Sequence, residues 1–257
     1  MALIEFRNVA KSFGRKVVYR DLSLDVHQGE SLTIVGGSGQ GKSVMLRMLI
    51  GLLSVDAGTI CFRGERISDF AEKQFIEVRR HISMLFQGGA LFDSLSVYDN
   101  VAYGIREHLR PPEDEVARRV GEALSNVGLA NIEQMWPHDL SGGMKKRVGL
   151  ARAIAFRPDV ILYDEPTTGL DPINVTRINR LILHLKRTLN VTSVVVTHDM
   201  HSAFAVSDRI AMIHDGVVVF EGTPEQVRTT ENPQVRDFVE GNAPENEDVE
   251  TLIRVSG

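Results

Sequence analysis

Short runs of Val, Ile and Leu recur along the chain, with stretches of helical spacing between them. The runs contain almost no polar alternation, which is typical of strands buried on both faces of a parallel sheet. We therefore expect buried strands at residues 32–35, 82–86, 160–163, 192–196 and 210–213.

Two stretches place apolar residues three and four positions apart, a spacing that predicts amphipathic helices. The first carries Val116, Val120, Leu124 and Val127, and the second carries Val175, Ile178, Ile182, Leu185 and Leu189. Because helices and buried strands alternate along the sequence, we expect an α/β fold with a mostly parallel core sheet.

Other segments depart from this alternation. The first ~30 residues and residues 59–62 alternate polar and apolar positions around turns at 14–15 and 56–58, which predicts an antiparallel β flank. Residues from about 88 to 157 look helical and are punctuated by two proline-containing turns, which indicates a helical lobe inserted in the core. We expect one domain over residues 1–240 and an acidic, apolar-poor tail over 241–257.

Composition narrows the class of protein. A chain of 257 residues with 43% hydrophobic residues can bury a sizeable core. The formal net charge of −5 argues against nucleic acid as a partner. A single cysteine, Cys61, excludes an intrachain disulfide and fits a reducing cytoplasm. No apolar run approaches the ~20 residues that span a bilayer, so any membrane path should belong to another chain.

A glycine-rich segment follows the first buried run and matches the phosphate-loop pattern. It consists of Gly36, Gly37, Ser38, Gly39, Gln40, Gly41, Lys42 and Ser43. Glycines let successive backbone N–H groups point at phosphate oxygens, and the start of the next helix adds partial positive charge. In this pattern Lys42 reaches the β- and γ-phosphates and the Ser43 hydroxyl binds Mg²⁺. A merely flexible turn would not explain a Lys-Ser pair at a strand-to-helix junction.

Two carboxylates, Asp164 and Glu165, end the strand at residues 160–163. Ligands of open α/β sheets bind at this end of the strands. We expect Asp164 to hold the Mg²⁺ sphere and Glu165 to orient and polarise the attacking water. The pair could instead cap the following loop, but a phosphate loop in the same chain favours the Mg²⁺ interpretation.

A second candidate anion site consists of Ser141, Gly142 and Gly143, just before a helix expected at residues 144–156. Backbone amides at a helix start bind anions. By itself this segment is also a plausible helix cap. Since one phosphate loop needs no second γ-phosphate site in the same chain, we interpret it as serving the nucleotide of a partner subunit.

With these motifs in this order, the chain resembles the ABC transporter ATPase family over nearly its whole length. The resemblance implies the P-loop NTPase fold of ABC ATPases, with ATP and Mg²⁺ as ligands. It implies further roles for Phe13 as an adenine-stacking aromatic, Gln87 as a contact to Mg²⁺ and water, Asp171 as a dimer-interface residue and His198 as the switch histidine. It also implies a head-to-tail homodimer that sandwiches two ATP molecules.

Residues 84–102 and 235–241 are similar to the ATPases of Mla-type phospholipid transport systems. That resemblance implies an integral-membrane permease, a periplasmic MCE-domain lipid-binding subunit and, in some systems, a STAS-domain protein. It places the chain at the cytoplasmic face of the inner membrane, held there through the permease. The apolar residues 89–92 either pack within the lobe or line the groove that accepts a permease helix, and we favour the groove.

Two other functions fit the same motifs. An importer for small polar solutes would use the same ATPase with a different permease. A soluble assembly ATPase would use it without any permease. The residues alone do not separate these hypotheses, because the ATPase does not contact the cargo.

Overall fold

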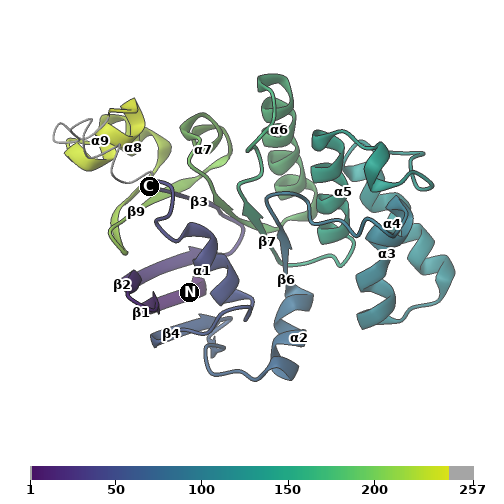
Figure 1. The fold of residues 1–257 in the computed structure, drawn as a ribbon, viewed down its shortest axis with the longest axis horizontal. Helices are drawn as coiled ribbons and strands as arrows, with labels where there is room; N and C mark the ends of the chain where they lie inside the picture. The colour runs from purple at the N-terminus through teal and green to yellow at the C-terminus, as the bar shows by residue number, and fades with distance from the viewer. Residues whose placement is uncertain (1, 243–257) are drawn as a thin grey trace.

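The computed structural model describes residues 2–242. Their strands form one ten-stranded sheet (Figure 1). The strand order is β5-β4-β1-β2-β10-β9-β3-β8-β7-β6. Of the predicted acidic tail, only Gly241 and Asn242 are described, so the prediction for residues 243–257 lies outside these residues.

The core of the sheet is parallel, as the buried runs predicted. Its five strands are β9 (Arg209–His214), β3 (Ser31–Val35), β8 (Thr192–Val196), β7 (Val160–Asp164) and β6 (Ile82–Leu85). Neighbours β9 and β3, β3 and β8, β8 and β7, and β7 and β6 pair in parallel. Each strand lies within one residue of its predicted bounds at either end.

Alternate residues of the core strands pack into different hydrophobic clusters. On β7, Val160 and Leu162 belong to the cluster beneath the β flank, whereas Ile161 and Tyr163 belong to the cluster of the helical segment. Successive side chains of a strand point to opposite faces of the sheet. Both faces are therefore buried, which explains why these strands have apolar runs without polar alternation.

The antiparallel flank is also present. It comprises β1 (Ala2–Phe13), β2 (Lys16–His27), β4 (Ala57–Phe62) and β5 (Glu65–Arg66). A tight turn at Gly14 and Arg15 joins β1 to β2, as expected, and Gly14 supplies a φ of +57°.

Strand β10 (Val217–Gly222) was not predicted, and it joins the flank to the core. It pairs antiparallel with β9 and in parallel with β2. The turn before it contains Asp215 and Gly216, both at positive φ. An Asp-Gly pair between two apolar runs is a strong hairpin signal, so the sequence did contain the information for this strand.

The helices cover the sheet and form a separate group at one end (Figure 1). They are α1 (Lys42–Leu49), α2 (Glu72–His81), α3 (Val97–Gly104), α4 (Glu113–Asn126), α5 (Gly142–Ile154), α6 (Pro172–Leu189), α7 (Met200–Val206), α8 (Pro224–Thr229) and α9 (Pro233–Glu240). A π-helical turn at Ile105–Leu109 and a 3₁₀ turn at Pro137–Asp139 complete the set. In Figure 1, α3, α4 and α5 lie together, far from β1 and β2.

Helix α5 begins two residues earlier than predicted. The expectation was a helix over residues 144–156, whereas α5 runs from Gly142 to Ile154. Ser141 is its N-cap, and its hydroxyl accepts a hydrogen bond from the Met144 amide at 3.3 Å. A serine cap compensates for the low helix propensity of the two glycines, which therefore form the first turn.

Between residues 2 and 242, the helices all fall short of the length and apolar character that a membrane crossing requires.

Helix α6 provides a test of the packing with a matched control. Ile182 is fully buried, whereas Ile173 on the same helix is 66% exposed. We expect Ile182→Ala to lower the free energy of unfolding by about 2–5 kcal/mol, because it removes buried methyl groups and leaves a cavity. The same change at Ile173 should cost less than about 0.5 kcal/mol. Urea denaturation measures both, and equal losses would contradict the assigned packing.

Candidate nucleotide site

The parallel strands bring four loops to one edge of the sheet. They follow β3, β6, β7 and β8 and carry the phosphate loop, Gln87, Glu165 and His198, respectively. These loops surround a cavity of about 420 Å³, here called the phosphate-loop cavity. Its predicted lining residues are Phe13, Ser38, Gly39, Gly41, Lys42, Ser43, Gln87, Glu165 and His198, and it is also lined by Lys16, Val18 and Val44.

Two glycines allow the phosphate loop to curl closely against its neighbours. A Cβ atom on Gly36 would lie 2.4 Å from the Ile213 carbonyl oxygen, and one on Gly41 would lie 2.3 Å from Val18. Both glycines have positive φ, at +154° and +90°. A side chain at position 36 would clash with backbone and one at position 41 with the Val18 side chain, and both positions have backbone conformations that favour glycine.

Gln40 points away from the cavity. Its side-chain oxygen accepts a hydrogen bond from the Asp215 amide at 3.0 Å, which ties the loop to the β9–β10 turn. The Tyr19 hydroxyl donates to the Gly41 carbonyl at 2.6 Å from the other side. Burial raises the pKa of Tyr19, so it remains a neutral donor. Sequence reasoning predicted neither anchoring contact.

The Lys42 ammonium is directed back along the loop. It donates to the Gly36 carbonyl at 2.7 Å and to the Gly37 carbonyl at 3.0 Å, and it lies 3.9 Å from Glu165. Burial lowers the pKa of Lys42, and the nearby charges of Glu165 and Asp164 oppose that shift. The amine therefore sits where an anionic ligand would favour its charged form.

Ser43 lines the cavity and is hydrogen-bonded to Asp164, which is buried and does not line it. The Ser43 hydroxyl donates to Asp164 Oδ1 at 2.5 Å, and Asp164 is only 3% exposed. Burial raises the pKa of Asp164, and the Ser43 hydrogen bond partly opposes the shift. Mg²⁺ is usually held by one or two carboxylates together with phosphate oxygens and water. This hydroxyl–carboxylate pair, with the Gln87 amide on the same cavity, fits that ligand set.

Glu165 occupies a strained backbone position directly after β7. Its φ is +49°, in the left-handed region that costs non-glycine residues about 1–3 kcal/mol. Its amide donates to the Val196 carbonyl at 3.0 Å, which holds the residue against the end of β8. Strain of this kind persists only where surrounding contacts fix it, and it turns the Glu165 side chain into the cavity.

Hydrogen bonds from three residues fix the Glu165 carboxylate. The Thr168 hydroxyl donates to it at 3.0 Å and the Thr197 hydroxyl at 3.4 Å. His198 Nδ1 lies 3.0 Å away, and its ring is 58% exposed in side-chain area. The two threonines were not predicted, although both lie within three residues of a predicted site residue.

Lys146 of α5 supports the loop after Glu165. Its buried ammonium donates to the carbonyls of Pro166 at 2.9 Å and Thr168 at 2.6 Å. Burial lowers its pKa, and the Glu165 charge opposes the shift. This contact links the helix that begins at Ser141 to the Glu165 loop, and it has no local signal in the sequence.

The remaining predicted residues do not line the phosphate-loop cavity. Ser141 and Gly142 are exposed at the start of α5, and Gly143 is buried beside Asn174. Asp171 caps α6 by accepting hydrogen bonds from the Ile173 and Asn174 amides, both at 3.0 Å. These bonds, above all the one from Asn174, lower the pKa of Asp171. The structure therefore gathers Ser141–Gly143 and Asp171 into a second cluster.

Comparison with known proteins gives consistent matches. Residues 19–168 match the family described as ABC transporter. The chain is 42% identical to "Intermembrane phospholipid transport system ATP-binding protein MlaF" of Haemophilus influenzae, over 94% of this chain and 91% of that relative. It is 40% identical to "Probable ribonucleotide transport ATP-binding protein mkl" of Mycobacterium leprae, over 93% of this chain and 69% of that relative.

Solved structures agree with the sequence matches. The cbiO1 protein of Clostridium perfringens, part of the ABC transporter complex cbiONQ, superposes with a TM-score of 0.82 at 30% identity, over 95% of this chain and 96% of that chain. A dimeric ATP-binding cassette in a post-hydrolysis state, bound to ADP and Pi, superposes with a TM-score of 0.78 at 30% identity, over 86% and 98% of the two chains.

The role of Glu165 can be tested by Glu165→Gln. The amide keeps the shape of the side chain but cannot accept a proton from water, so we expect hydrolysis to fall about 10²- to 10⁴-fold. ATP binding should persist, because the phosphate loop is unaltered. Glu225→Gln, at an exposed position on α8, is the matched control. Undiminished hydrolysis in Glu165→Gln, measured as phosphate release, would exclude it as the base.

Thr168 is a positioning residue whose effect should be separable from ATP binding. Hydrogen bonds to charged groups contribute about 1.5–3 kcal/mol, so we expect Thr168→Val to lower kcat about tenfold or more. KM for ATP should change little, and Thr168→Ser should restore kcat because it restores the hydroxyl. Steady-state kinetics of the three proteins measure this. A change confined to KM would refute the assignment.

Proposed function

The chain belongs to the ABC transporter family, and from that premise we propose that it hydrolyses ATP to drive phospholipid transport between the inner and outer membranes. The ATPase activity follows from the family and the fold. The cargo rests on one observation, the 42% identity to an intermembrane phospholipid transport ATPase over 91% of that relative.

The geometry supports a role for each residue of the phosphate-loop cavity. Glu165 would accept a proton from the attacking water. His198, whose Nδ1 lies 3.0 Å from the Glu165 carboxylate, would hold that carboxylate in position relative to the γ-phosphate. The Lys42 ammonium would give up its hydrogen bonds to the loop carbonyls and donate to phosphate oxygens instead. Ser43, Asp164 and Gln87 would hold Mg²⁺, which neutralises developing charge on the phosphates. Phe13, 45% exposed at the cavity rim, would stack on adenine.

A homodimer completes the site in this proposal. Ser141–Gly143 lie outside the cavity of their own chain, and Ser141 and Gly142 are exposed at the start of α5. Backbone amides at a helix start suit the γ-phosphate held by a partner subunit. Asp171 would lie at the interface beside Ile173, whose 66% exposure leaves apolar surface for a partner to cover. The solved structure of a similar ATP-binding cassette is itself dimeric, which supports a dimer for this chain.

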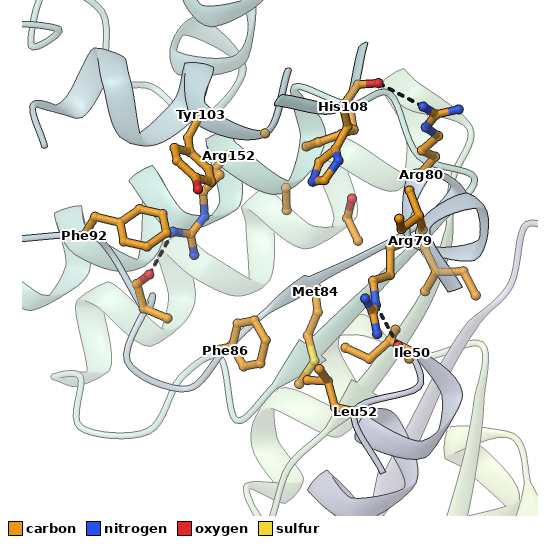
Figure 2. A pocket seen from close by; sticks show the side chains of 17 residues that line it. Ile50, Leu52, Arg79, Arg80, Met84, Phe86, Phe92, Tyr103, His108 and Arg152 are labelled. Atoms are coloured by element: carbon orange, nitrogen blue, oxygen red, sulfur yellow. Dashed lines mark hydrogen bonds between the residues drawn. The ribbon is translucent and has the colours of Figure 1, made fainter. Parts of the chain in front are cut away.

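A groove lined by α2, β6, α3 and α5 suits a membrane subunit. It has a volume of about 450 Å³ and lies between the α2–β6 region and the helices α3 and α5 (Figure 2). Its rim includes Leu52, Phe92 and Tyr103, which are 51%, 44% and 46% exposed. Ala90 and Phe92 of the apolar segment after Gln87 line this groove. Leu91 instead packs against the cluster of the helical segment. That the groove accepts a permease helix is part of this proposal.

The proposal includes further partners and a location. A permease helix would occupy the groove and hold the chain at the cytoplasmic face of the inner membrane. A periplasmic MCE-domain subunit would bind the lipid, and a STAS-domain protein would bind the ATPase, as the Mla-type resemblance implies. Residues 1–240 would act as one ABC ATPase domain, with residues of about 88–157 moving as its helical lobe.

Transport of a small polar solute is the second candidate. It is favoured by the 40% identity to a relative named for ribonucleotide transport. A soluble assembly ATPase is less supported, because large apolar side chains such as Leu52 and Phe92 line the exposed rim of the groove.

Co-purification from detergent-solubilised membranes separates these functions. We expect the tagged chain to bring down a multi-span permease and an MCE-domain protein, identified by mass spectrometry. The complex should move labelled phospholipid between vesicles in the presence of ATP, and Glu165→Gln should abolish that movement while leaving the complex intact. Soluble partners alone would indicate an assembly ATPase, and a solute receptor with ribonucleotide uptake would indicate the importer.

A further inference from the structure

The groove combines apolar walls with basic groups. Figure 2 shows Met84 and Phe86 on one side and Phe92 and Tyr103 on another. Its lining also includes the basic side chains Arg79, Arg80, His108 and Arg152. No Asp or Glu is among the described residues that line it. The groove is thus complementary to an apolar segment with negative charge.

Two of the three arginines already have carboxylate partners on their own helix, α2. Arg79 forms an ion pair with Glu72, and Arg80 forms one with Glu77 at 2.9 Å. Arg79 also donates to the Ile50 carbonyl at 2.9 Å. These contacts explain the positions of both side chains without any partner protein.

Arg152 differs from them. Its guanidinium donates to the carbonyls of Gly89 at 2.9 Å and Ala90 at 2.8 Å, and it lies 5.9 Å from the Phe92 ring centroid. Within residues 2–242, no Asp or Glu carboxylate forms an ion pair with Arg152, whereas Arg79 and Arg80 each have one. Burial lowers the pKa of Arg152. Arg152 is half-buried. Its guanidinium has five N–H donors, of which the two carbonyls engage only some, and its geometry matches that of a carboxylate.

We propose that Arg152 binds a carboxylate on an apolar helix of the membrane subunit when that helix enters the groove. The inference rests on the proposed function, because it assumes a membrane subunit. It adds the chemistry of the contact: one Asp or Glu, surrounded by apolar side chains, paired with one arginine of α5. The recessed position of Arg152 between apolar walls favours a side chain that projects from a helix over the flat surface of a lipid bilayer.

The same arginine contacts the segment that follows Gln87. Gly89 and α5 are in close contact, since a Cβ atom on Gly149 would lie 2.8 Å from the Gly89 oxygen, and one on Gly89 would lie 2.9 Å from the Lys145 oxygen. A carboxylate that binds Arg152 therefore competes with the Gly89 and Ala90 carbonyls for the N–H donors of its guanidinium. Occupancy of the groove would in this way be communicated to Gln87, at the phosphate-loop cavity.

A zero-length cross-link tests the contact directly. Arg152→Lys places a primary amine at this position, and a carbodiimide joins an amine only to a carboxylate in direct contact. The test uses the full chain in its complex with the co-purified membrane subunit. We expect a cross-link from position 152 to a single Asp or Glu in a cytoplasmic segment of that subunit, mapped by mass spectrometry.

Arg147→Lys is the matched control. Arg147 is also on α5 and also donates to backbone carbonyls, those of Val127 and Gly128, but it lies outside the groove. It should give no cross-link to the membrane subunit. A cross-link from position 152 to a second copy of the chain, or none while Arg79→Lys, at another groove position, does cross-link, would overturn the proposal. A cross-link from position 152 to a phospholipid instead of a protein would also overturn the proposal.

A second measurement begins with changes in the membrane subunit alone, so its first step does not depend on the folding of a variant of this chain. Each Asp and Glu in the cytoplasmic segments of the membrane subunit is replaced in turn by its amide. One replacement should weaken binding of the chain at least about tenfold. Combined with Arg152→Gln, it should weaken binding no further than either change alone. Additive losses for every carboxylate would refute the contact.

The two proposals fail in different ways. If no membrane subunit co-purifies, the proposed function fails and this inference fails with it. If a permease co-purifies and binds with the same affinity after every carboxylate replacement, only the contact to Arg152 is wrong.

Discussion

The alignment of the parallel strands is the constraint on which the site depends. Ile34 pairs with Val196, Asp164 pairs with Val196, and Leu85 pairs with Tyr163, so these strands end nearly level. The phosphate loop, Gln87, Glu165 and His198 each begin within two residues of a strand end. A shift of one residue in any pairing would exchange the buried faces of a strand and also move a reacting group.

Close contacts then convert this alignment into fixed geometry. Glu165 keeps a left-handed backbone because its amide is bonded to Val196 and its carboxylate to Thr168 and His198. Gly89 rests against α5 because Gly149 has no side chain there. Arrangements of this kind place a carboxylate or an amide more accurately than a free loop could.

The features that could be predicted from the sequence are those that depend on a local pattern of residues. The core strands and the phosphate loop have continuous apolar runs or fixed spacing, and the structure confirms the fold that they predicted. Strand β10 was missed although Asp215 and Gly216 signalled its turn. Helix α5 was started two residues too late, because Gly142 and Gly143 were assigned to the cap and instead form the first turn. Lys146 and Arg152 could not be predicted. Their partners, Pro166 and Gly89, are distant in sequence, and only the fold brings them together.

Helix α5 carries Ser141 at its start and Arg152 eleven residues later, a span of roughly 16 Å at 1.5 Å per residue. Its two ends serve different subunits in the proposed dimer. Through Gly89, a docked helix would act on the ATP of its own subunit, and through the rigid axis of α5 it would act on the ATP of the partner. Each permease contact would therefore affect both ATP sites, the one in its own subunit and the one shared with the partner. Both ATP sites would then depend on both permease contacts, which favours concerted hydrolysis of the two ATP molecules.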